Sequence, residues 1–298
     1  MDDFKSKTAF ITGGAAGIGL AMAREFLAAG ARVVIADIRQ DALDKAAASL
    51  SGDVRAIRLD VTDREAWARA ADQVGAVHIL CANAGIFIGG PTQDATFDDW
   101  DFCLGINLGG VVNAVRTFVP RMIAQGAAGH IVLTSSINGL FASGAVGPYT
   151  ASKFAVTGIG ECLRVNLAPY GIGVSILCPG PVVTDLFAST PAVRPKALSD
   201  TGAHLVALDE TDPTSQEIFA GAMSVEEVGR KVMQGLRRND LYIITHGEIR
   251  DVLEERMKAV LAALPNEPIP PGRAKSARVL YDVPAYAEQS AKPAPGPV

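Results

Sequence analysis

Tyr149 and Lys153 form a pair of side chains that could carry out acid–base chemistry. They are four residues apart in the segment Tyr-Thr-Ala-Ser-Lys, so a helix over this segment would place the phenol and the ammonium group on one face. A nearby ammonium group favours the phenolate and lowers the tyrosine pKa, which would let Tyr149 donate or accept a proton near neutral pH. The pattern is common, however, and taken alone it fits an exposed pair without function.

Ser136 supplies a hydroxyl group that could act on the same substrate atom. It follows a predicted strand and lies 13 positions before Tyr149. Ligands of parallel sheets bind at the carboxyl ends of the strands. We therefore expect the hydroxyl groups of Ser136 and Tyr149 to face one substrate oxygen.

A glycine-rich turn, Thr12-Gly-Gly-Ala-Ala-Gly-Ile-Gly19, follows the first predicted strand and opens the first predicted helix. Glycines there allow the backbone to approach a pyrophosphate, and the helix N-terminus supplies N–H groups. Asp37 ends the second predicted strand, 18 positions after Gly19, where a carboxylate can hold an adenosine ribose. A tight turn without a ligand is the alternative, which this context disfavours. Arg39 is either a solvated charge or a group that softens the rejection of a 2′-phosphate.

Short β-rich segments alternate with longer helical segments along most of the chain. Strands are predicted at residues 8–12, 31–37, 54–60, 77–82, 130–135, 173–178 and 241–245. Apolar strands that alternate with helices indicate a parallel sheet covered on both faces. We therefore expect one α/β domain over residues 1–264, with a Rossmann-type doubly wound parallel sheet of about seven strands.

Two segments interrupt this alternation. Residues 185–223 have no clear period and contain three prolines, so we expect a loop with broken helices that acts as a substrate lid. A static surface loop is the alternative. Residues 265–298 contain eight of the 17 prolines and are expected to form a disordered C-terminal tail.

Composition excludes several classes of protein. The chain has 27 basic and 32 acidic residues, a net charge of −5, which argues against non-specific nucleic-acid binding. The four cysteines and four histidines show no metal-ligand spacing, so we expect no metal site and reduced core thiols in a cytoplasmic protein. No apolar leader segment opens the chain, and its uncharged stretches are interrupted by Gly, Pro and Ser, so we expect no membrane contact.

Taken together, these motifs resemble the short-chain dehydrogenase/reductase family, in its compact single-domain branch. The matching segments run in the family's order from Thr12 to Thr184, and the glycine spacing Gly-x-x-x-Gly-x-Gly is that of the compact branch. Ala82 replaces the first asparagine of the family's Asn-Asn-Ala-Gly segment. We expect this departure to alter a contact that stabilises the sheet rather than the chemistry.

The resemblance implies a role for each residue of a catalytic tetrad. Tyr149 would exchange a proton with the substrate oxygen during hydride transfer, and Ser136 would hydrogen-bond that oxygen. Lys153 would lower the Tyr149 pKa and hold the nicotinamide ribose, and Asn107 would anchor a water molecule in a proton relay to Lys153. Ser135 is rejected because only Ser136 has the family's spacing to Tyr149. The resemblance further implies that the cofactor is bound by Gly13, Ala16, Gly17, Ile18, Gly19, Asp37, Ile38, Asp60, Val61, Asn83, Ala84, Gly85, Tyr149, Lys153, Pro179, Gly180, Val182 and Thr184.

The predicted function is that of an NAD-dependent oxidoreductase that interconverts a secondary alcohol and a ketone. An NADP-dependent carbonyl reductase is one alternative, which depends on Asp37. A non-catalytic nucleotide-sensing regulator on the same fold is the other. The C-terminal third resembles bacterial dehydrogenases of the benzylic alcohol of aryl ethers, which implies a bulky, aryl or hydrophobic substrate. The helices predicted at about 98–123 and 149–168 are apolar nearly all round, so we expect a homodimer or homotetramer.

Overall fold

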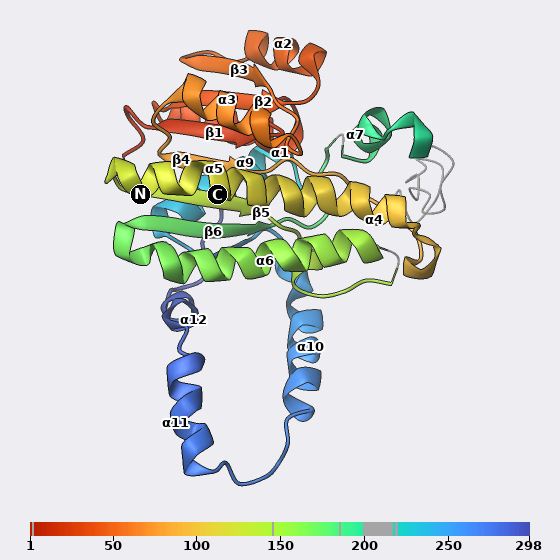
Figure 1. Cartoon of the computed structure of the whole chain (residues 1–298), viewed down its shortest axis with the longest axis vertical. Coiled ribbons are helices and arrows are strands. Elements are labelled where there is room, and N and C mark those ends of the chain that lie inside the picture. Colours follow the sequence, from red (N-terminus) through yellow and green to blue (C-terminus); the bar gives the residue numbers. More distant parts are fainter. Residues whose placement is uncertain (2, 145, 185, 199–216, 218–219) are drawn as a thin grey trace.

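A parallel sheet forms the centre of the computed structural model, which describes all residues except 2, 145, 185, 199–216 and 218–219. The order of its seven strands is β3-β2-β1-β4-β5-β6-β7, and every neighbouring pair is parallel (Figure 1). The strands are β1 (Thr8–Thr12), β2 (Arg32–Asp37), β3 (Val54–Arg58), β4 (Ile79–Ala82), β5 (Gly129–Thr134), β6 (Ile172–Cys178) and β7 (Tyr242–Ile244). The predicted Rossmann-type fold is confirmed.

Helices cover both faces of the sheet (Figure 1). One core cluster joins the sheet to α1 (Gly17–Ala28), α2 (Gln40–Ser49) and α9 (Val225–Arg238). A second cluster joins its other face to α3 (Arg64–Val74), α5 (Gly110–Gln125) and α6 (Gly147–Leu167). Because both faces are covered, the central strands are mainly apolar and deeply buried, as β1 illustrates with five consecutive buried residues.

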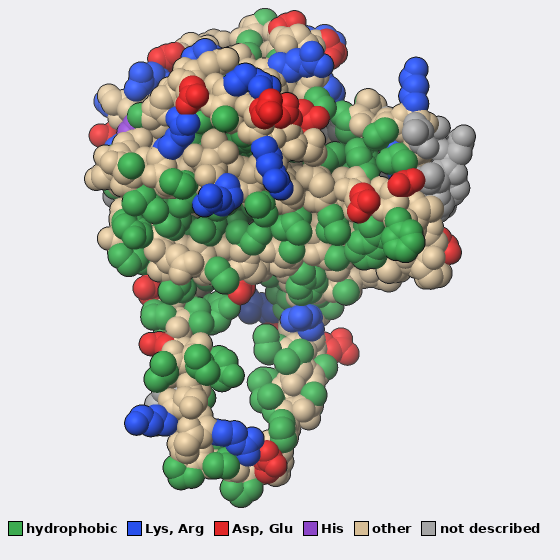
Figure 2. Space-filling model, in the orientation of Figure 1, with side chains coloured by type: hydrophobic (Ala, Val, Ile, Leu, Met, Phe, Trp, Pro, Cys, Tyr) green, Lys and Arg blue, Asp and Glu red, His purple; other side chains and the backbone are tan. Residues whose placement is uncertain are grey.

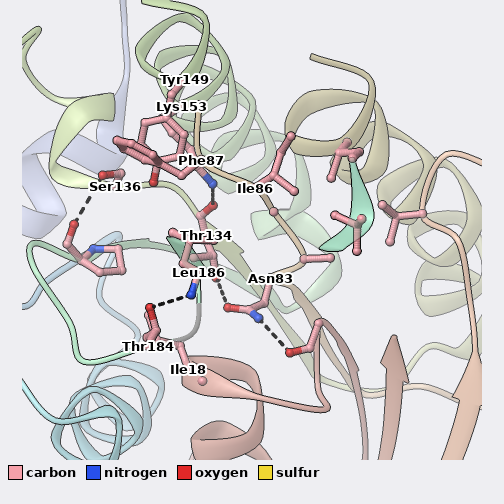
Figure 3. Close-up of a pocket in the computed structure, with 18 of the residues that line it drawn as sticks. Ile18, Asn83, Ile86, Phe87, Thr134, Ser136, Tyr149, Lys153, Thr184 and Leu186 are labelled. Carbon is pink, nitrogen blue, oxygen red and sulfur yellow. Dashed lines mark hydrogen bonds between the residues drawn. The ribbon is translucent and has the colours of Figure 1, made fainter. Parts of the chain in front are cut away.

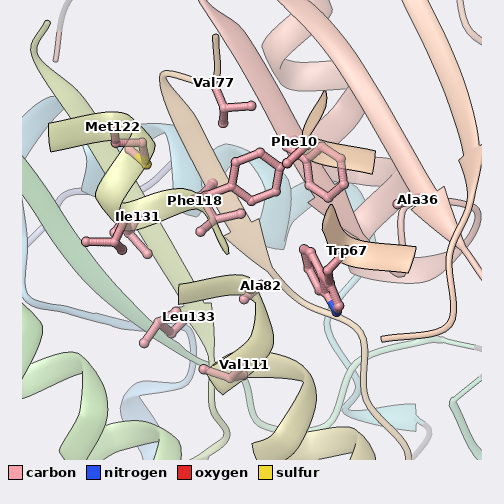
Figure 4. Close-up of a cluster of buried hydrophobic side chains, with 14 of the residues drawn as sticks. Phe10, Ala36, Trp67, Val77, Ala82, Val111, Phe118, Met122, Ile131 and Leu133 are labelled. Carbon is pink, nitrogen blue, oxygen red and sulfur yellow. The ribbon is translucent and has the colours of Figure 1, made fainter. Parts of the chain in front are cut away.

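Three aromatic side chains fill the centre of the second cluster (Figure 4). Phe10 of β1 lies between Phe118 of α5 and Trp67 of α3, with ring centroids 4.8 and 5.9 Å away. All three side chains are fully buried. The indole N–H of Trp67 donates to the carbonyl of Val61 at 2.9 Å, so this core also fixes a turn at the end of β3.

One long helical run combines α4 (Phe97–Leu104), a π-helical turn (Gly105–Gly109) and α5. By length and composition alone, the run Phe97–Gln125 could cross a membrane. Its residues Val111, Phe118 and Met122 nevertheless lie in the core against the sheet. The π-helical turn contains Asn107, and such turns often occur at functional sites.

The predicted lid segment, 185–223, lies only partly within the described residues. Its described part contains α7 (Leu186–Val193) and a 3-10 turn (Lys196–Leu198), followed after a gap by the approach to α9. The expectation of broken helices agrees with these two short elements. Its second apolar cluster, 205–208, lies outside the described residues.

The disorder predicted for residues 265–298 is wrong. After α10 (Arg250–Ala262) leaves the body, α11 (Pro271–Leu280) and α12 (Pro284–Ser290) return the chain toward α6 (Figure 1). The Tyr286 hydroxyl donates to Glu161 of α6 at 2.7 Å, and Glu288 pairs with Arg164 at 3.3 Å. Proline content misled the prediction because prolines open both helices, in the first turn, where they are well tolerated.

The four cysteines are free thiols, but they are not all in the core. Cys81, Cys103 and Cys178 are buried, as predicted. Cys162 is exposed on α6, so the prediction is wrong at that position. The apolar sequence around Cys162 belongs to a helix whose outer face is open in the single chain.

Candidate active site

A cavity of about 730 Å³ lies at the carboxyl ends of the parallel strands. Segments that directly follow six of the strands, β1 to β6, contribute to its wall. Every predicted site residue lines this cavity except Gly19 and Asn107. Those that line it are Gly13, Ala16, Gly17, Ile18, Asp37, Ile38, Asp60, Val61, Asn83, Ala84, Gly85, Ser136, Tyr149, Lys153, Pro179, Gly180, Val182 and Thr184.

The glycine-rich turn presents an uncapped helix end to this cavity. Gly13 has a φ of +62°, a left-handed conformation that favours glycine. Gly19 is needed for packing, because a Cβ there would lie 2.1 Å from the Gly13 carbonyl oxygen. The N-cap of α1, Ala16, provides no side-chain hydrogen bond, and the first turn of α1 contains no acidic residue. The turn therefore fits the pyrophosphate of a dinucleotide.

Asp37 and Arg39 form an ion pair beside the cavity. The Asp37 carboxylate is buried, with 8% of the side chain exposed, and it accepts hydrogen bonds from the backbone N–H and the Nε of Arg39 at 3.1 and 3.3 Å. Arg39 is therefore not simply a solvated charge, because it pairs with Asp37. Its expected effect of softening the rejection of a 2′-phosphate stays a prediction. The carboxylate lies at the end of β2, where it could accept bonds from ribose hydroxyls.

Asn83 connects the ends of three strands beneath the cavity (Figure 3). Its amide nitrogen donates to the Thr12 carbonyl at 3.1 Å, and its amide oxygen accepts from the Thr134 hydroxyl at 3.1 Å. The Thr12 hydroxyl in turn accepts from the backbone N–H of Asn83 at 2.9 Å. These bonds hold β1, β4 and β5 in the register that forms the cavity floor.

The turn after β3 is fixed by bonds within the protein. Asp60 accepts hydrogen bonds from the N–H and the hydroxyl of Thr62 at 2.9 and 2.7 Å. The Val61 carbonyl accepts from Trp67 and from the Asn113 amide, each at 2.9 Å. This part of the cavity wall therefore has its shape before any ligand binds.

Ser136, Tyr149 and Lys153 meet at one end of the cavity (Figure 3). Tyr149 and Lys153 occupy successive turns of α6, and Ser136 follows β5. The Ser136 side chain accepts a hydrogen bond from the Asn138 N–H at 3.2 Å. The hydroxyl of the rejected neighbour, Ser135, donates instead to the Lys153 carbonyl at 2.9 Å, which commits it to the fold.

The pKa values at this site differ from the sequence-based prediction. Burial raises the pKa of Tyr149 to about 12, and the interaction of the phenol with Ser136 only partly opposes this increase. Burial also lowers the pKa of Lys153 to about 8. The predicted lowering of the Tyr149 pKa is not found in the ligand-free protein, because desolvation of the buried phenol has the largest effect.

Asn107 lies behind the cavity wall rather than in it. Its amide oxygen accepts from the Ile86 N–H at 2.8 Å, and its amide nitrogen donates to the Ile86 carbonyl at 3.0 Å and to Ser152 at 3.1 Å. A Cβ at Gly85 would lie 3.1 Å from the Asn107 oxygen and 3.5 Å from the Lys153 ammonium nitrogen. The two side chains thus approach the same glycine, and the water relay between them stays a prediction.

The segment 179–184 forms another wall of the cavity. The Pro179 carbonyl accepts from the Ile137 N–H at 2.9 Å, directly after Ser136. Val182 forms an isolated β-bridge with Met223. The Thr184 hydroxyl accepts from the Leu186 N–H at 3.4 Å (Figure 3). Thr184 therefore joins this wall to the start of α7.

Sequence reasoning missed the apolar side chains around Tyr149. The ring of Phe87 lies 5.0 Å from the ring of Tyr149, measured between centroids. The other apolar side chains near this end of the cavity come from distant segments and include Ile86, Phe102, Ile106, Val146 and Val193. Ile86 and Phe87 directly follow the motif glycine, Gly85, which was the available signal. Phe102 and Val146 carried no such signal.

Comparison with known proteins agrees with this geometry. The sequence pattern of the short chain dehydrogenase family matches residues 7–194. A C alpha-dehydrogenase of Sphingobium sp. is 40% identical over 281 residues, which cover 91% of each chain.

Two solved structures extend the similarity to almost the whole chain. A putative short-chain dehydrogenase from Novosphingobium aromaticivorans is 36% identical with a TM-score of 0.80, covering 97% of this chain and 99% of the other. A short-chain dehydrogenase/reductase from Burkholderia phymatum, solved in complex with NAD, is 32% identical with a TM-score of 0.80, covering 91% of this chain and all of the other. The similarity therefore covers the segments that line the cavity and also the C-terminal segments after residue 194.

Proposed function

The chain belongs to the short-chain dehydrogenase family and is an oxidoreductase of CH–OH groups, and from this premise we propose that it is NAD-dependent and interconverts a secondary alcohol and a ketone. The observation that carries the proposal is one cavity that joins the glycine turn and Asp37 to the hydroxyl groups of Ser136 and Tyr149. NAD, when bound, would supply the hydride acceptor.

Tyr149 acts as the acid and base in this proposal. With a pKa of about 12 in the ligand-free protein, the phenol holds its proton at neutral pH and is ready to donate it to a ketone oxygen. Ser136 hydrogen-bonds that oxygen. In the direction of alcohol oxidation, Tyr149 must first release its proton. The neutral form of Lys153, which predominates above its pKa of about 8, is the neighbouring base that takes up this proton, and the alcohol proton then passes to the phenolate.

The proposed substrate is a bulky, aryl or hydrophobic secondary alcohol. The cavity beside Tyr149 is lined by Phe87, Phe102, Val146 and Val193. Substrate binding to such an apolar wall is favourable because it buries apolar surface of the substrate. The 40% identical relative is named a C alpha-dehydrogenase, which supports a dehydrogenase reaction. Arg39 beside Asp37 keeps NADP-dependent carbonyl reduction as the second candidate.

We further propose that the protein has a substrate lid, forms a homo-oligomer and is located in the cytoplasm. The segment 185–223 would close over the substrate, because α7 lines the cavity through Leu186 and Val193. The chain would form a homodimer or homotetramer through α5 and α6, whose outer faces carry the exposed side chains of Val112 and Val165. Figure 2 shows hydrophobic side chains gathered over this face of the molecule. Reduced thiols fit the cytoplasm.

A substrate panel with both cofactors tests the central proposal. Purified protein would be assayed for NAD and NADP reduction with aryl and alkyl secondary alcohols, and for the reverse reaction with the matching ketones. We expect NAD reduction with aryl secondary alcohols as the best substrates. Binding of NAD without turnover of any alcohol or ketone would support the nucleotide-sensing alternative instead.

A further inference from the structure

Two buried polar residues after β7 hold the backbone of the cavity wall. Thr245 and His246 are 5% and 8% exposed, and neither lines the cavity. The N–H of Gly180, which does line the cavity, lies 3.2 Å from the Thr245 hydroxyl oxygen and 3.1 Å from Nδ1 of His246. The hydroxyl oxygen and Nδ1 are themselves 2.6 Å apart. The three groups therefore form a small closed set of hydrogen bonds.

The donors and acceptors of this set fix the state of the histidine. The Gly180 N–H can only donate, so Nδ1 of His246 must be an acceptor, and the Thr245 hydroxyl can donate its proton to the same nitrogen. The ring proton then lies on Nε2. Nε2 is buried and has no hydrogen-bond partner among the described residues. An unpaired buried N–H is unfavourable for folding, so an apolar side chain would suit the fold better than histidine at position 246.

Steric contact confines the same backbone segment. A Cβ at Gly180 would lie 2.7 Å from Cγ and 2.8 Å from Nδ1 of His246. On the other side of the segment, the Pro179 carbonyl accepts from the Ile137 N–H at 2.9 Å, and the Ser136 hydroxyl lies 3.5 Å from it (Figure 3). The Pro179–Gly180 backbone is thus held between the end of β7 and the residue proposed to bind the substrate oxygen.

We propose that Thr245 and His246 are positioning residues for the oxidoreductase reaction. They hold the Gly180 N–H, and through the Pro179 carbonyl they set the place of the Ser136 hydroxyl and of the cofactor wall. This inference rests on the proposed function, since it concerns the placement of NAD and substrate relative to Tyr149. Neither residue exchanges a proton with the substrate.

Paired substitutions separate the hydrogen-bond acceptors from simple packing. Thr245→Val with His246→Leu removes both acceptors and keeps side chains of similar size. Thr245→Ser with His246→Asn keeps both acceptors, because the asparagine oxygen can take the place of Nδ1. For each pair we would measure the Kd of NAD by calorimetry, the kcat and KM for a secondary alcohol, and the thermal unfolding midpoint.

We expect the apolar pair, Thr245→Val with His246→Leu, to lower kcat by about 100-fold, the usual effect of a small misplacement at an active site. NAD binding should weaken several-fold, while the KM for the alcohol should change little. The acceptor-keeping pair should retain most of the wild-type kcat. A folded apolar pair with wild-type kcat and Kd would overturn the proposal, and so would an acceptor-keeping pair as impaired as the apolar one.

Thr245→Val alone covers the case in which the apolar pair does not fold. It leaves His246 in place and should still lower kcat, by less than the pair does; an unchanged kcat would overturn the inference. Failure of the proposed function itself looks different, because the wild type would then bind neither NAD nor NADP or would turn over no alcohol.

Discussion

The ammonium nitrogen of Lys153 lies 5.4 Å from the centre of the Tyr149 ring and donates a hydrogen bond to the Thr134 carbonyl at 3.0 Å. Burial favours the neutral form of both side chains, so it raises the pKa of the phenol and lowers the pKa of the amine. In the ligand-free site, Lys153 is therefore the group that gives up a proton more readily.

Replacing Tyr149 with phenylalanine should remove the acid–base group and leave the fold intact. General acid–base catalysis contributes roughly 10²–10⁴ in rate, so we expect kcat to fall by at least that factor. The Kd of NAD, measured by calorimetry, should barely change because only one hydroxyl is lost. A Tyr149→Phe enzyme that keeps most of its activity on its best alcohol would show that another group exchanges the proton.

The buried Lys153 should make stability depend on pH in a defined window. Its pKa is lowered from 10.5 to about 8, so between these values the unfolded chain holds a proton that the folded chain has released. The free energy of unfolding of the wild type, compared with that of Lys153→Met, should therefore rise as the pH increases from about 8 to 10.5. The rise should be on the order of 3 kcal/mol, since a pKa difference of one corresponds to about 1.4 kcal/mol.

Urea unfolding at several pH values would measure this effect. Lys45→Met, at an exposed lysine of α2, is the matched control for the loss of one ammonium group. A difference between wild type and Lys153→Met that stays constant from pH 8 to 10.5 would contradict the buried ammonium group.

Asp37 should determine the preference for NAD over NADP. Its carboxylate can accept bonds from a ribose 2′-hydroxyl and repels a 2′-phosphate. Asp37→Ala should lower the NAD:NADP ratio of kcat/KM by about tenfold or more, since about 1.4 kcal/mol changes a binding ratio tenfold. Arg39→Ala, which keeps the carboxylate, is the control and should not lower the ratio. A wild type that prefers NADP would instead make Arg39 a phosphate ligand.

The sequence predicted the parts of the site that local motifs define. The motifs that contain Gly13, Asn83 and Ser136 occur along the chain in the same order as in the family, and each directly follows a predicted strand. Their convergence at one edge of the sheet could therefore be predicted. The pKa values could not, because desolvation depends on how completely Tyr149 and Lys153 are buried by distant segments. The apolar wall was missed for the same reason: Phe87 and Val193 line one cavity only after the chain has folded.

The tail illustrates a different limit. Proline content predicts disorder when no partner is known, and it cannot reveal that Tyr286 and Glu288 reach Glu161 and Arg164 of α6. Such contacts between segments more than 100 positions apart leave no local pattern in the sequence.

Assembly through α5 and α6 can be tested with two substitutions. Val112 and Val165 are 39% and 38% exposed in the single chain. Val112→Glu with Val165→Glu would place charges in an apolar interface, where an unpaired charge is costly, so light scattering at micromolar concentration should show a shift from dimer or tetramer toward monomer. Lys45→Glu on the exposed face of α2 is the control. A monomeric wild type would contradict the assembly.

The lid proposal predicts that α7 is held closed by contacts that can be broken. Arg194, just after α7, forms an ion pair with Asp99 of α4, whose side chain is fully buried, while 9% of the Arg194 side chain is exposed. The Thr190 hydroxyl accepts from the Phe87 N–H at 3.1 Å, which ties α7 to the loop beside Tyr149. Opening the lid would separate both contacts.

Asp99→Asn with Arg194→Gln removes both charges and avoids leaving one buried charge without a partner. We expect faster hydrogen exchange across α7 and a several-fold higher alcohol KM, with the Kd of NAD nearly unchanged; Phe187→Ala should likewise affect substrate kinetics more than cofactor binding. Glu65→Gln with Arg69→Gln, an exposed ion pair on α3, controls for charge loss. A lid that excludes water must protect its backbone from hydrogen exchange more strongly when it is closed over its substrate. If hydrogen exchange across 185–223 is the same with and without NAD and alcohol, the segment is therefore a static loop.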